Sequence, residues 1–188
     1  MSKGLPSITF LRECFQYDAD TGRLVWKHRP RKHFNSARAA NGFEARFAGN
    51  DAGKIEAQGY RVVGILWNGT KHYLKVHRVI WAIATGKWPD ELIDHINMNR
   101  LDNRLENLRQ ATHSQNQMNG EYRKRNKLGV KGVTTRNGKF YASISIARKV
   151  KHLGTFQSIQ AASAAYNAAA TKYYGAFARL SKVEISNV

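Results

Sequence analysis

The sequence predicts an α+β protein composed of two small domains, and three observations lead to this expectation. Its 188 residues suit two small hydrophobic cores better than one large core. Short strand-like runs joined by glycine-containing turns are followed, in two places, by a single helical segment. A basic polar stretch at 121–127 separates these two places. We therefore expect a first domain at 1–120, a linker at 121–127 and a second domain at 128–181.

The first domain opens with a short predicted helix and a strand. Residues 7–16 place apolar side chains on one helical face, with Ser7 as the capping residue. A turn ending at Gly22 precedes a strand at 23–27. Residues 28–50 are basic and polar with little periodicity, which predicts no regular element. This region is either a solvated loop or an arm that lies along phosphate groups, and both interpretations stay open.

A hairpin and a helix follow in the first domain. Strand-like runs at 60–67 and 71–75 flank an Asn-Gly dipeptide at 68–69, which is a strong signal for a tight hairpin turn. Apolar residues then recur at helical spacing from residue 76 to residue 83. Gly86 follows as a C-terminal stop for this helix.

The second domain has a different pattern of three strands and one alanine-rich helix. The strands are predicted at 130–135, 139–146 and 151–156, and the helix at 158–174. Small alanine side chains would let the helix lie close against a three-stranded sheet. The helical face expected to pack on the sheet consists of Ile159, Ala162, Tyr166, Ala169 and Tyr173.

The charge of the chain points to its partners. Lysine and arginine together number 31 against 13 acidic residues, a formal net charge of +18, which predicts a polyanionic partner. A membrane is the alternative, but no stretch approaches the roughly 20 apolar residues that a membrane span needs. The N-terminus lacks the long apolar run of a secretory signal, so we expect a cytoplasmic protein. Cys14 is the single cysteine, which excludes an internal disulfide and a zinc ribbon or finger; we expect a buried, inert thiol.

The residues with the most chemical potential surround the adjacent pair Asp94 and His95, which end an apolar strand-like run. A polar loop rich in asparagine follows. Thr112, with a glutamine three residues later, forms the capping-box pattern that opens a helix. Asn116 would lie in the first turns of that helix, facing back towards the strand. A carboxylate beside an imidazole, with a returning carboxamide, can hold a hard cation next to a general base, which is the equipment for phosphodiester cleavage.

This segment resembles the ββα-metal motif of the HNH nucleases, in the H-N-N variant of phage homing endonucleases. The resemblance implies that His95 is the general base and that Asp94 is a metal ligand. It also implies that Asn107 braces the loop and that Asn116 is the last metal ligand. His113 is the second choice for that ligand, because it lies three residues before Asn116. The implied fold is a ββα-metal nuclease motif at about 74–120, preceded by helix and hairpin elements.

The implied activity is that of a metal-dependent DNA endonuclease of the homing type, which nicks one strand or cuts both. Hard oxygen ligands suit a single Mg²⁺, or another divalent cation such as Mn²⁺, and no zinc site is expected. The resemblance places such a protein in the bacterial host cytoplasm of a bacteriophage. Two alternatives remain: a non-catalytic DNA-binding regulator with a decayed nuclease motif, and a basic RNA-binding protein.

Residues 128–181 resemble the AP2 DNA-binding domain over most of their length. The resemblance is carried by Lys131-Gly132-Val133, Gly138-Lys139-Phe140, Leu153-Gly154-Thr155-Phe156, Ala165-Tyr166 and Tyr174-Gly175. It implies that the exposed face of the sheet enters the major groove of double-stranded DNA while the helix supports the other face, and we expect a monomer. Alternation places Ala142, Ile144 and Ile146 on the helix side. The residues expected to contact DNA are Lys131, Thr134, Arg136, Tyr141, Ser143, Ser145, Arg148, Lys149, Lys151 and His152.

One further DNA contact is considered in the first domain. Arg78 lies at the start of the helix that follows the hairpin, directly after His77. It either contacts a phosphate near the nuclease motif or belongs to a satisfied polar pair with His77, and the sequence leaves both interpretations open.

Overall fold

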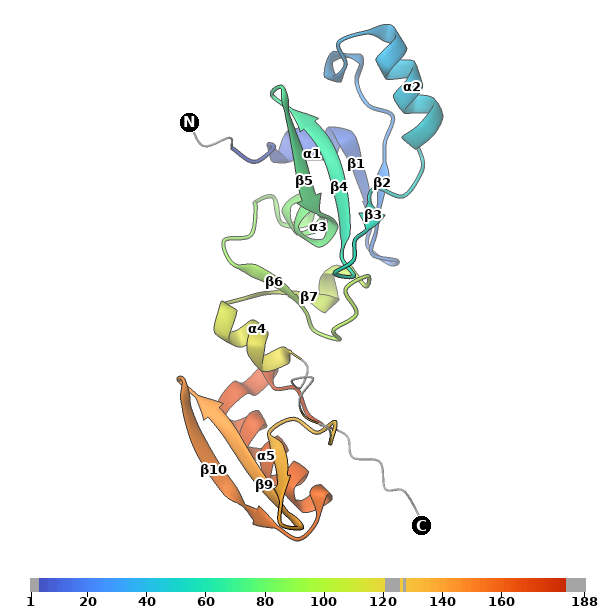
Figure 1. Cartoon of the computed structure of the whole chain (residues 1–188). Coiled ribbons are helices and arrows are strands. Elements are labelled where there is room, and N and C mark those ends of the chain that lie inside the picture. The colour runs from blue at the N-terminus through green and yellow to red at the C-terminus, as the bar shows by residue number, and fades with distance from the viewer. Residues whose placement is uncertain (1–3, 121–125, 127, 182–188) are drawn as a thin grey trace. The chain divides into compact units, whose positions relative to one another are not determined.

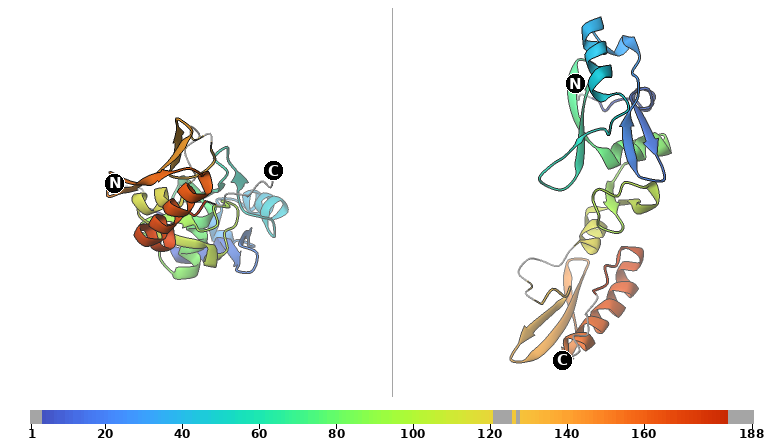
Figure 2. Two further views of the ribbon diagram at one scale, coloured as in Figure 1. Left: turned by 90° about the horizontal axis from the view of Figure 1, so that it is seen from below. Right: turned by 90° about the vertical axis from the view of Figure 1, so that its right-hand side faces the viewer.

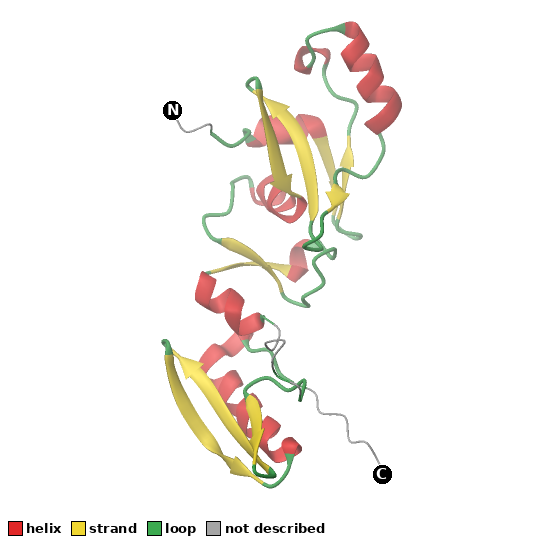
Figure 3. Ribbon diagram, viewed as in Figure 1, coloured by secondary structure: helices red, strands yellow, loops and turns green. Residues whose placement is uncertain are grey.

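The computed structural model describes residues 4–120, 126 and 128–181, and it divides the chain into two compact units, Met1–Ala111 and Thr112–Val188. Figure 1 labels the elements of each unit and Figure 3 colours them by type. Each unit mixes helices with small antiparallel sheets, which confirms the predicted α+β class. The predicted linker lies outside the described residues except for Asn126, so the division at 121–127 stays a prediction.

The first unit begins with helix α1 (Ile8–Cys14), as predicted. It starts there because the Ser7 hydroxyl oxygen accepts a hydrogen bond from the Phe10 N–H at 3.2 Å. The helix ends earlier than predicted because the next residues form strand β1 (Phe15–Asp18), which pairs antiparallel with β2 (Arg23–Trp26). Pairing with a later segment of the chain overrides the local helical pattern.

The basic region after β2 contains a helix, so the expectation of no regular element there is wrong. Helix α2 (Ala37–Phe47) occupies the centre of the region, and Ser36 caps it. Phe43 and Phe47 lie one helical turn apart and pack against Trp26, with ring centroids 5.2 and 6.4 Å from it. The helix therefore depends on aromatic packing against another element. A 3-10 turn precedes it, η1 (Arg31–His33).

The predicted hairpin and the helix that follows it are both confirmed. Both residues of the turn, Asn68 and Gly69, have positive φ angles of 46° and 71°, which a two-residue hairpin turn requires. Helix α3 (Val76–Thr85) ends at Gly86, whose φ of 78° is left-handed. The hairpin belongs to a three-stranded sheet in the order β3 (Lys54–Ile55), β4 (Arg61–Trp67) and β5 (Thr70–Lys75).

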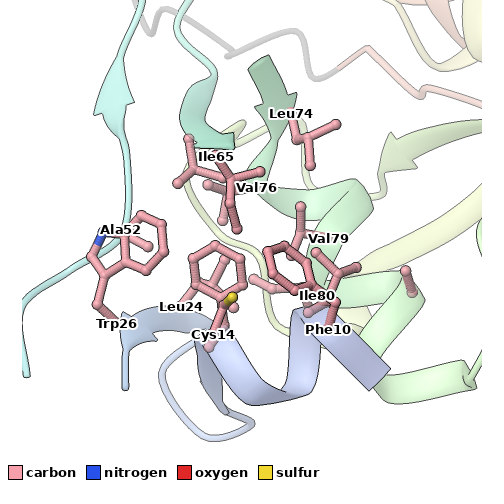
Figure 4. Close-up of a cluster of buried hydrophobic side chains, with 14 of the residues drawn as sticks. Phe10, Cys14, Leu24, Trp26, Ala52, Ile65, Leu74, Val76, Val79 and Ile80 are labelled. Atoms are coloured by element: carbon pink, nitrogen blue, oxygen red, sulfur yellow. The ribbon is translucent and has the colours of Figure 1, made fainter. Parts of the chain in front are cut away.

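The core of the first unit lies between α1, α3 and the sheets, as Figure 4 shows. Cys14 is fully buried in it, as expected, and burial raises the pKa of its thiol to about 11. Below this core, a two-stranded sheet carries the candidate active site. Its elements are β6 (Leu92–His95), the 3-10 turn η2 (Leu105–Asn107) and β7 (Leu108–Ala111).

The second unit begins with helix α4 (His113–Asn119). The predicted capping box is present, because Thr112 Oγ1 accepts the Gln115 N–H at 3.2 Å and Gln115 Oε1 accepts the Thr112 N–H at 2.9 Å. A three-stranded sheet and a long helix follow, and the helix runs along one face of the sheet (Figure 2, right). These elements are β8 (Val133–Arg136), β9 (Lys139–Ile146), β10 (Lys149–Phe156), α5 (Ile159–Tyr174) and η3 (Gly175–Phe177).

The predicted alternation along β9 is confirmed, because Ala142 and Ile144 are buried against α5. The predicted helix face is wrong at one position. Tyr173 is 39% exposed, and its neighbour Tyr174 packs on the sheet instead, donating its hydroxyl to the Ser145 carbonyl oxygen at 2.6 Å. Steps of four residues from Tyr166 lead to Tyr174, so the contact face follows that row of the helix.

Close packing also explains where the sheet of the second unit begins. The first strand starts at Val133, and Gly132 just before it has a φ of 72°. A Cβ atom at Gly132 would lie 2.0 Å from the Tyr166 ring, so only glycine fits there.

Among the described residues, none of the helices combines the length and apolar character needed to cross a bilayer.

Candidate active site

His95 is the last residue of β6, and its side chain is buried, with 4% of the residue exposed. Its Nε2 atom lies 3.0 Å from Oδ1 of Asn103, which comes from the polar loop. Burial is the main cause that lowers the pKa of His95 below its usual value, and the Asn103 hydrogen bond only partly opposes it. The imidazole is therefore neutral near pH 7, which is the form that a general base needs.

Asn107 connects the two ends of the polar loop that follows β6. Its Oδ1 accepts the Asn97 backbone N–H at 2.9 Å. Its Nδ2 donates to Asn97 Oδ1 at 3.0 Å and to the Asp102 carbonyl oxygen at 2.8 Å. Three hydrogen bonds from one carboxamide, only 6% exposed, hold the loop closed, which is the geometry that a bracing residue requires.

Asp94 lies directly opposite Arg109 in the β6–β7 register, and the Arg109 guanidinium makes two hydrogen bonds to one Asp94 carboxylate oxygen. Arg109 donates to Asp94 Oδ2 from Nε at 2.9 Å and from Nη2 at 2.8 Å. Both side chains are largely buried, so the pair is poorly screened by solvent. The sequence analysis missed Arg109, and only the strand register identifies it as the neighbour of Asp94.

The candidate metal ligands come from both units. Asp94 lies in the first unit, whereas Asn116 and His113 lie on α4 of the second. Within the described part of the chain, no three histidine, cysteine, aspartate or glutamate side chains are grouped so as to hold a metal ion. The Asp94 carboxylate and the Asn116 carboxamide each offer an oxygen ligand of the kind that Mg²⁺ prefers, and their joint coordination stays a prediction.

A second histidine, which the sequence analysis did not treat as part of the site, packs against His95. His77 lies in the first turn of α3 and is 4% exposed. Its ring is nearly perpendicular to that of His95, with an angle of 85° and centroids 5.0 Å apart. Tyr60 completes the group, with its centroid 5.3 Å from His77 and 6.1 Å from His95. Burial lowers the pKa of His77 to about 3, and the neighbouring His95 adds to the shift.

Two cations lie over the ring of Tyr60. The ammonium nitrogen of Lys75 is 4.3 Å from the ring centroid, and the guanidinium carbon of Arg100 is 4.8 Å from it. Both residues are exposed, so their charges are accessible beside the buried histidines. Accessible positive charge beside a buried imidazole is suited to an anionic partner.

Arg78 makes contacts that favour a structural role. Its Nη1 donates to the Glu91 carbonyl oxygen at 2.9 Å, and its Nη2 donates to the Pro89 carbonyl oxygen at 3.2 Å. These bonds tie the start of α3 to the segment that leads into β6. A phosphate contact from Arg78 stays a prediction.

The predicted DNA-contacting residues of the second unit lie mostly on the sheet, on the side away from α5. Tyr141 and Ser143 are half-buried there, and Lys131 lies elsewhere. The ammonium group of Lys131 donates to the carbonyl oxygens of Met118 and Gly120, at the end of α4, and burial lowers its pKa to about 8. We therefore remove Lys131 from the groove-facing set. Lys149 and Lys151 leave the set as well, because they pair in register with Ile146 and Ile144, which pack on the α5 side, and Lys151 donates to the Tyr173 hydroxyl of α5 at 3.1 Å. The exposed members that remain are Thr134, Arg136, Ser145, Arg148 and His152.

The burial of His77 predicts how the stability of the first unit depends on pH. The pKa of His77 is about 3 in the folded protein and about 6.5 in the unfolded chain, so only the unfolded state takes up a proton between these values. Stability is therefore fully present above about pH 6.5 and is lost as the pH falls, by up to about 1.4 kcal/mol per pH unit for His77.

Urea unfolding followed by tryptophan fluorescence measures this effect, because all four tryptophans lie before residue 111 and report on the first unit. His77→Phe keeps an aromatic ring and removes the titrating group, so we expect a shallower decline in the free energy of unfolding below pH 6.5. An identical pH dependence in His77→Phe and the wild type would contradict the assignment.

Three comparisons relate the chain to known proteins. Residues 74–118 match a family model described as HNH endonuclease. An uncharacterized HNH endonuclease from Acanthamoeba polyphaga mimivirus is 34% identical over 116 residues, which cover 59% of this chain and 59% of that relative. The chain thus spans about three fifths of that relative's length. A solved structure of DNA binding and cleavage by the HNH homing endonuclease I-HmuI has a TM-score of 0.39 and 23% identity, covering 61% of this chain and 55% of that one.

Proposed function

We propose that this protein is a metal-dependent DNA endonuclease of the homing type, acting through the HNH endonuclease segment of residues 74–118. The observation that carries the proposal is the state of His95. It lies within the matched segment, it is buried and neutral, and Asn103 holds its ring. A neutral imidazole held in place beside a carboxylate is what water activation for phosphodiester hydrolysis requires.

The residues of this chain would take different roles in the reaction. His95 takes a proton from the water that attacks the scissile phosphorus. Asn107 keeps the loop closed so that the imidazole remains oriented. Lys75 and Arg100, beside Tyr60, attract the phosphates that flank the cleaved bond.

A divalent cation would be held by Asp94 and by Asn116 or, as the second choice, His113. When bound, Mg²⁺ or Mn²⁺ would supply stabilisation of the negative charge that develops on the phosphate and the leaving oxygen. Arg109 shares the Asp94 carboxylate in this structure and offsets its charge. The products would carry a 5′-phosphate and a 3′-hydroxyl.

We further propose that the sheet of the second unit reads double-stranded DNA in the manner of the AP2 domain that its sequence resembles. Support comes from the difference between the two faces of this sheet. One face is covered by α5, and the opposite side carries exposed polar and basic residues. Its basic residues include Arg136 on β8, and Arg148 adds charge in the turn between β9 and β10.

Substitution of the ligands tests the metal assignment. Asp94→Ala and Asn116→Ala are expected to lower the cleavage rate by about 10²-fold or more and to raise the Mg²⁺ concentration needed for half-maximal rate. Titrating Mg²⁺ against the cleavage rate of each variant measures both effects. His113→Ala is the matched control on the same helix, and a larger loss in His113→Ala than in Asn116→Ala at saturating Mg²⁺ would transfer the ligand role to His113.

A further inference from the structure

Helix α4 ends against the side chain of a lysine that lies just before the sheet of the second unit. The last carbonyl groups of a helix lack partners within the helix and form the negative end of its dipole. At this end of α4 the ammonium group of Lys131 donates to the carbonyl oxygens of Met118 and Gly120, the latter at 2.7 Å. The three donors of one ammonium group can serve several carbonyl oxygens at once. Lys131 therefore caps α4 from a position eleven residues beyond Gly120.

The backbone around Lys131 is held by both the helix and the sheet of the second unit. The Lys131 N–H donates to Ser181 Oγ at 3.0 Å. The backbone of Ser181 in turn exchanges two hydrogen bonds of 2.9 Å with the Asn167 carboxamide of α5. The next residue, Gly132, accepts the Ser143 N–H of β9 through its carbonyl oxygen at 2.8 Å. One side chain thus connects the end of α4 to a segment that is fixed to the rest of the unit.

The charge of the second unit makes this contact costly to break. Residues 128–181 contain eight lysines and arginines and no aspartate or glutamate, so no carboxylate of this range offers Lys131 an ion pair. The residue is half-buried, and a buried cation is unfavourable unless acceptors surround it. In this structure the carbonyl oxygens at the end of α4 are those acceptors. Separation of α4 from Lys131 would leave both the cation and the helix end without them.

We propose that Lys131 is a positioning residue that clamps α4 to the second unit, so that the protein cuts DNA at a fixed number of base pairs from the sequence that it reads. The inference rests on the proposed function, in which a residue of α4 binds the metal and the sheet reads the DNA. Asn116 and His113 both lie on α4, so it holds for either ligand. With α4 clamped, the ligand and the reading surface move as one body. The AP2 resemblance assigns Lys131 to DNA contact, and the clamp gives it a different role.

The clamp can be measured without cleavage or metal. Nitroxide labels at Ser114→Cys in α4 and Gln160→Cys in α5 would occupy exposed positions, and the native Cys14 is fully buried and should not react. Double electron–electron resonance on the full-length protein should give one narrow distance distribution. Lys131→Met removes all three donors, and hydrogen bonds from a charged donor shift such an equilibrium by about 10-fold or more. We expect the population outside the narrow peak to rise by about that factor, whereas Lys131→Arg should keep the peak.

The position of the cut connects the clamp to the reaction. On an end-labelled DNA fragment that the wild type cuts, we expect one cut position per strand. Lys131→Met should bind the fragment with unchanged affinity and also cut at neighbouring positions, whereas Lys131→Arg should cut at the wild-type position. Lys172→Met is the matched control, because it removes an equal charge from α5, where the ammonium nitrogen lies 5.7 Å from the Tyr173 ring centroid. Its distance distribution and cut position should equal those of the wild type.

The failures of the two proposals are distinguishable. A broad distribution in the wild type, or a wild-type distribution in folded Lys131→Met, would overturn the clamp even if the protein cleaves DNA. A broadened distribution with an unchanged cut position would overturn the fixed cutting distance. A clamp that behaves as expected in a protein that never cleaves DNA would overturn the proposed function alone. Lys131→Gln, which is shorter and uncharged, takes the place of Lys131→Met if the methionine variant does not fold.

Discussion

His95→Ala is expected to lower the cleavage rate by about 10²- to 10⁴-fold, which is the range that a general base contributes. DNA affinity should stay nearly unchanged, because a base acts on the transition state and not on the bound ground state. Single-turnover cleavage of a labelled duplex gives the rate, and fluorescence anisotropy in the absence of divalent metal gives the Kd.

The matched control is a histidine outside the site. His28 is exposed and pairs with Glu44, so His28→Ala should cleave at the wild-type rate. A folded His95→Ala protein with full activity would remove His95 from the mechanism.

Salt concentration is expected to have a large effect on DNA affinity. A net charge of +18 implies many phosphate contacts. If roughly eight phosphates are neutralised, the logarithm of affinity falls against the logarithm of salt concentration with a slope of about −7. Between about 50 and 200 mM salt, affinity should then fall by about four orders of magnitude. Single-turnover cleavage at saturating protein should be far less sensitive, because the buried histidine acts on a phosphate that is already docked.

Two sets of substitutions locate these phosphate contacts. Neutralising Arg123, Lys124, Arg125 and Lys127 of the predicted linker should make the slope shallower by up to about 3.6 units if each contacts a phosphate. The matched set on the sheet of the second unit comprises Arg136, Arg148, Lys149 and Lys151. A slope unchanged by the linker substitutions would assign the contacts to the two units and leave the linker as a solvated spacer.

The elements that sequence predicted well depend on local chemistry. The Asn68-Gly69 turn needs two residues that tolerate positive φ, and the Thr112 capping box satisfies helix N–H groups within a few residues. Helix α2 depends instead on Phe43 and Phe47 packing against Trp26, a contact between distant residues that local periodicity does not encode.

The residues of the candidate site also fall into those that the sequence identifies and those that only the structure identifies. Asp94, His95 and Asn107 stand out in the sequence because a motif groups them. Their partners do not, since Arg109 becomes the neighbour of Asp94 only through the β6–β7 register. His77 contacts His95 only in the folded chain, and Asn103 is one asparagine among several until its carboxamide is placed. Sequence thus identifies the reactive groups, whereas tertiary structure identifies the residues that orient them.

The most direct test of the nuclease assignment is incubation of supercoiled plasmid DNA with the full-length protein in the presence of Mg²⁺ or Mn²⁺, with parallel samples in EDTA and with His95→Ala. We expect nicked or linear products with 5′-phosphate and 3′-hydroxyl ends for the wild type with metal, and none in either control. A protein that binds the plasmid tightly and leaves it supercoiled at every concentration of both metals would contradict the assignment and identify a DNA-binding regulator with a decayed nuclease motif.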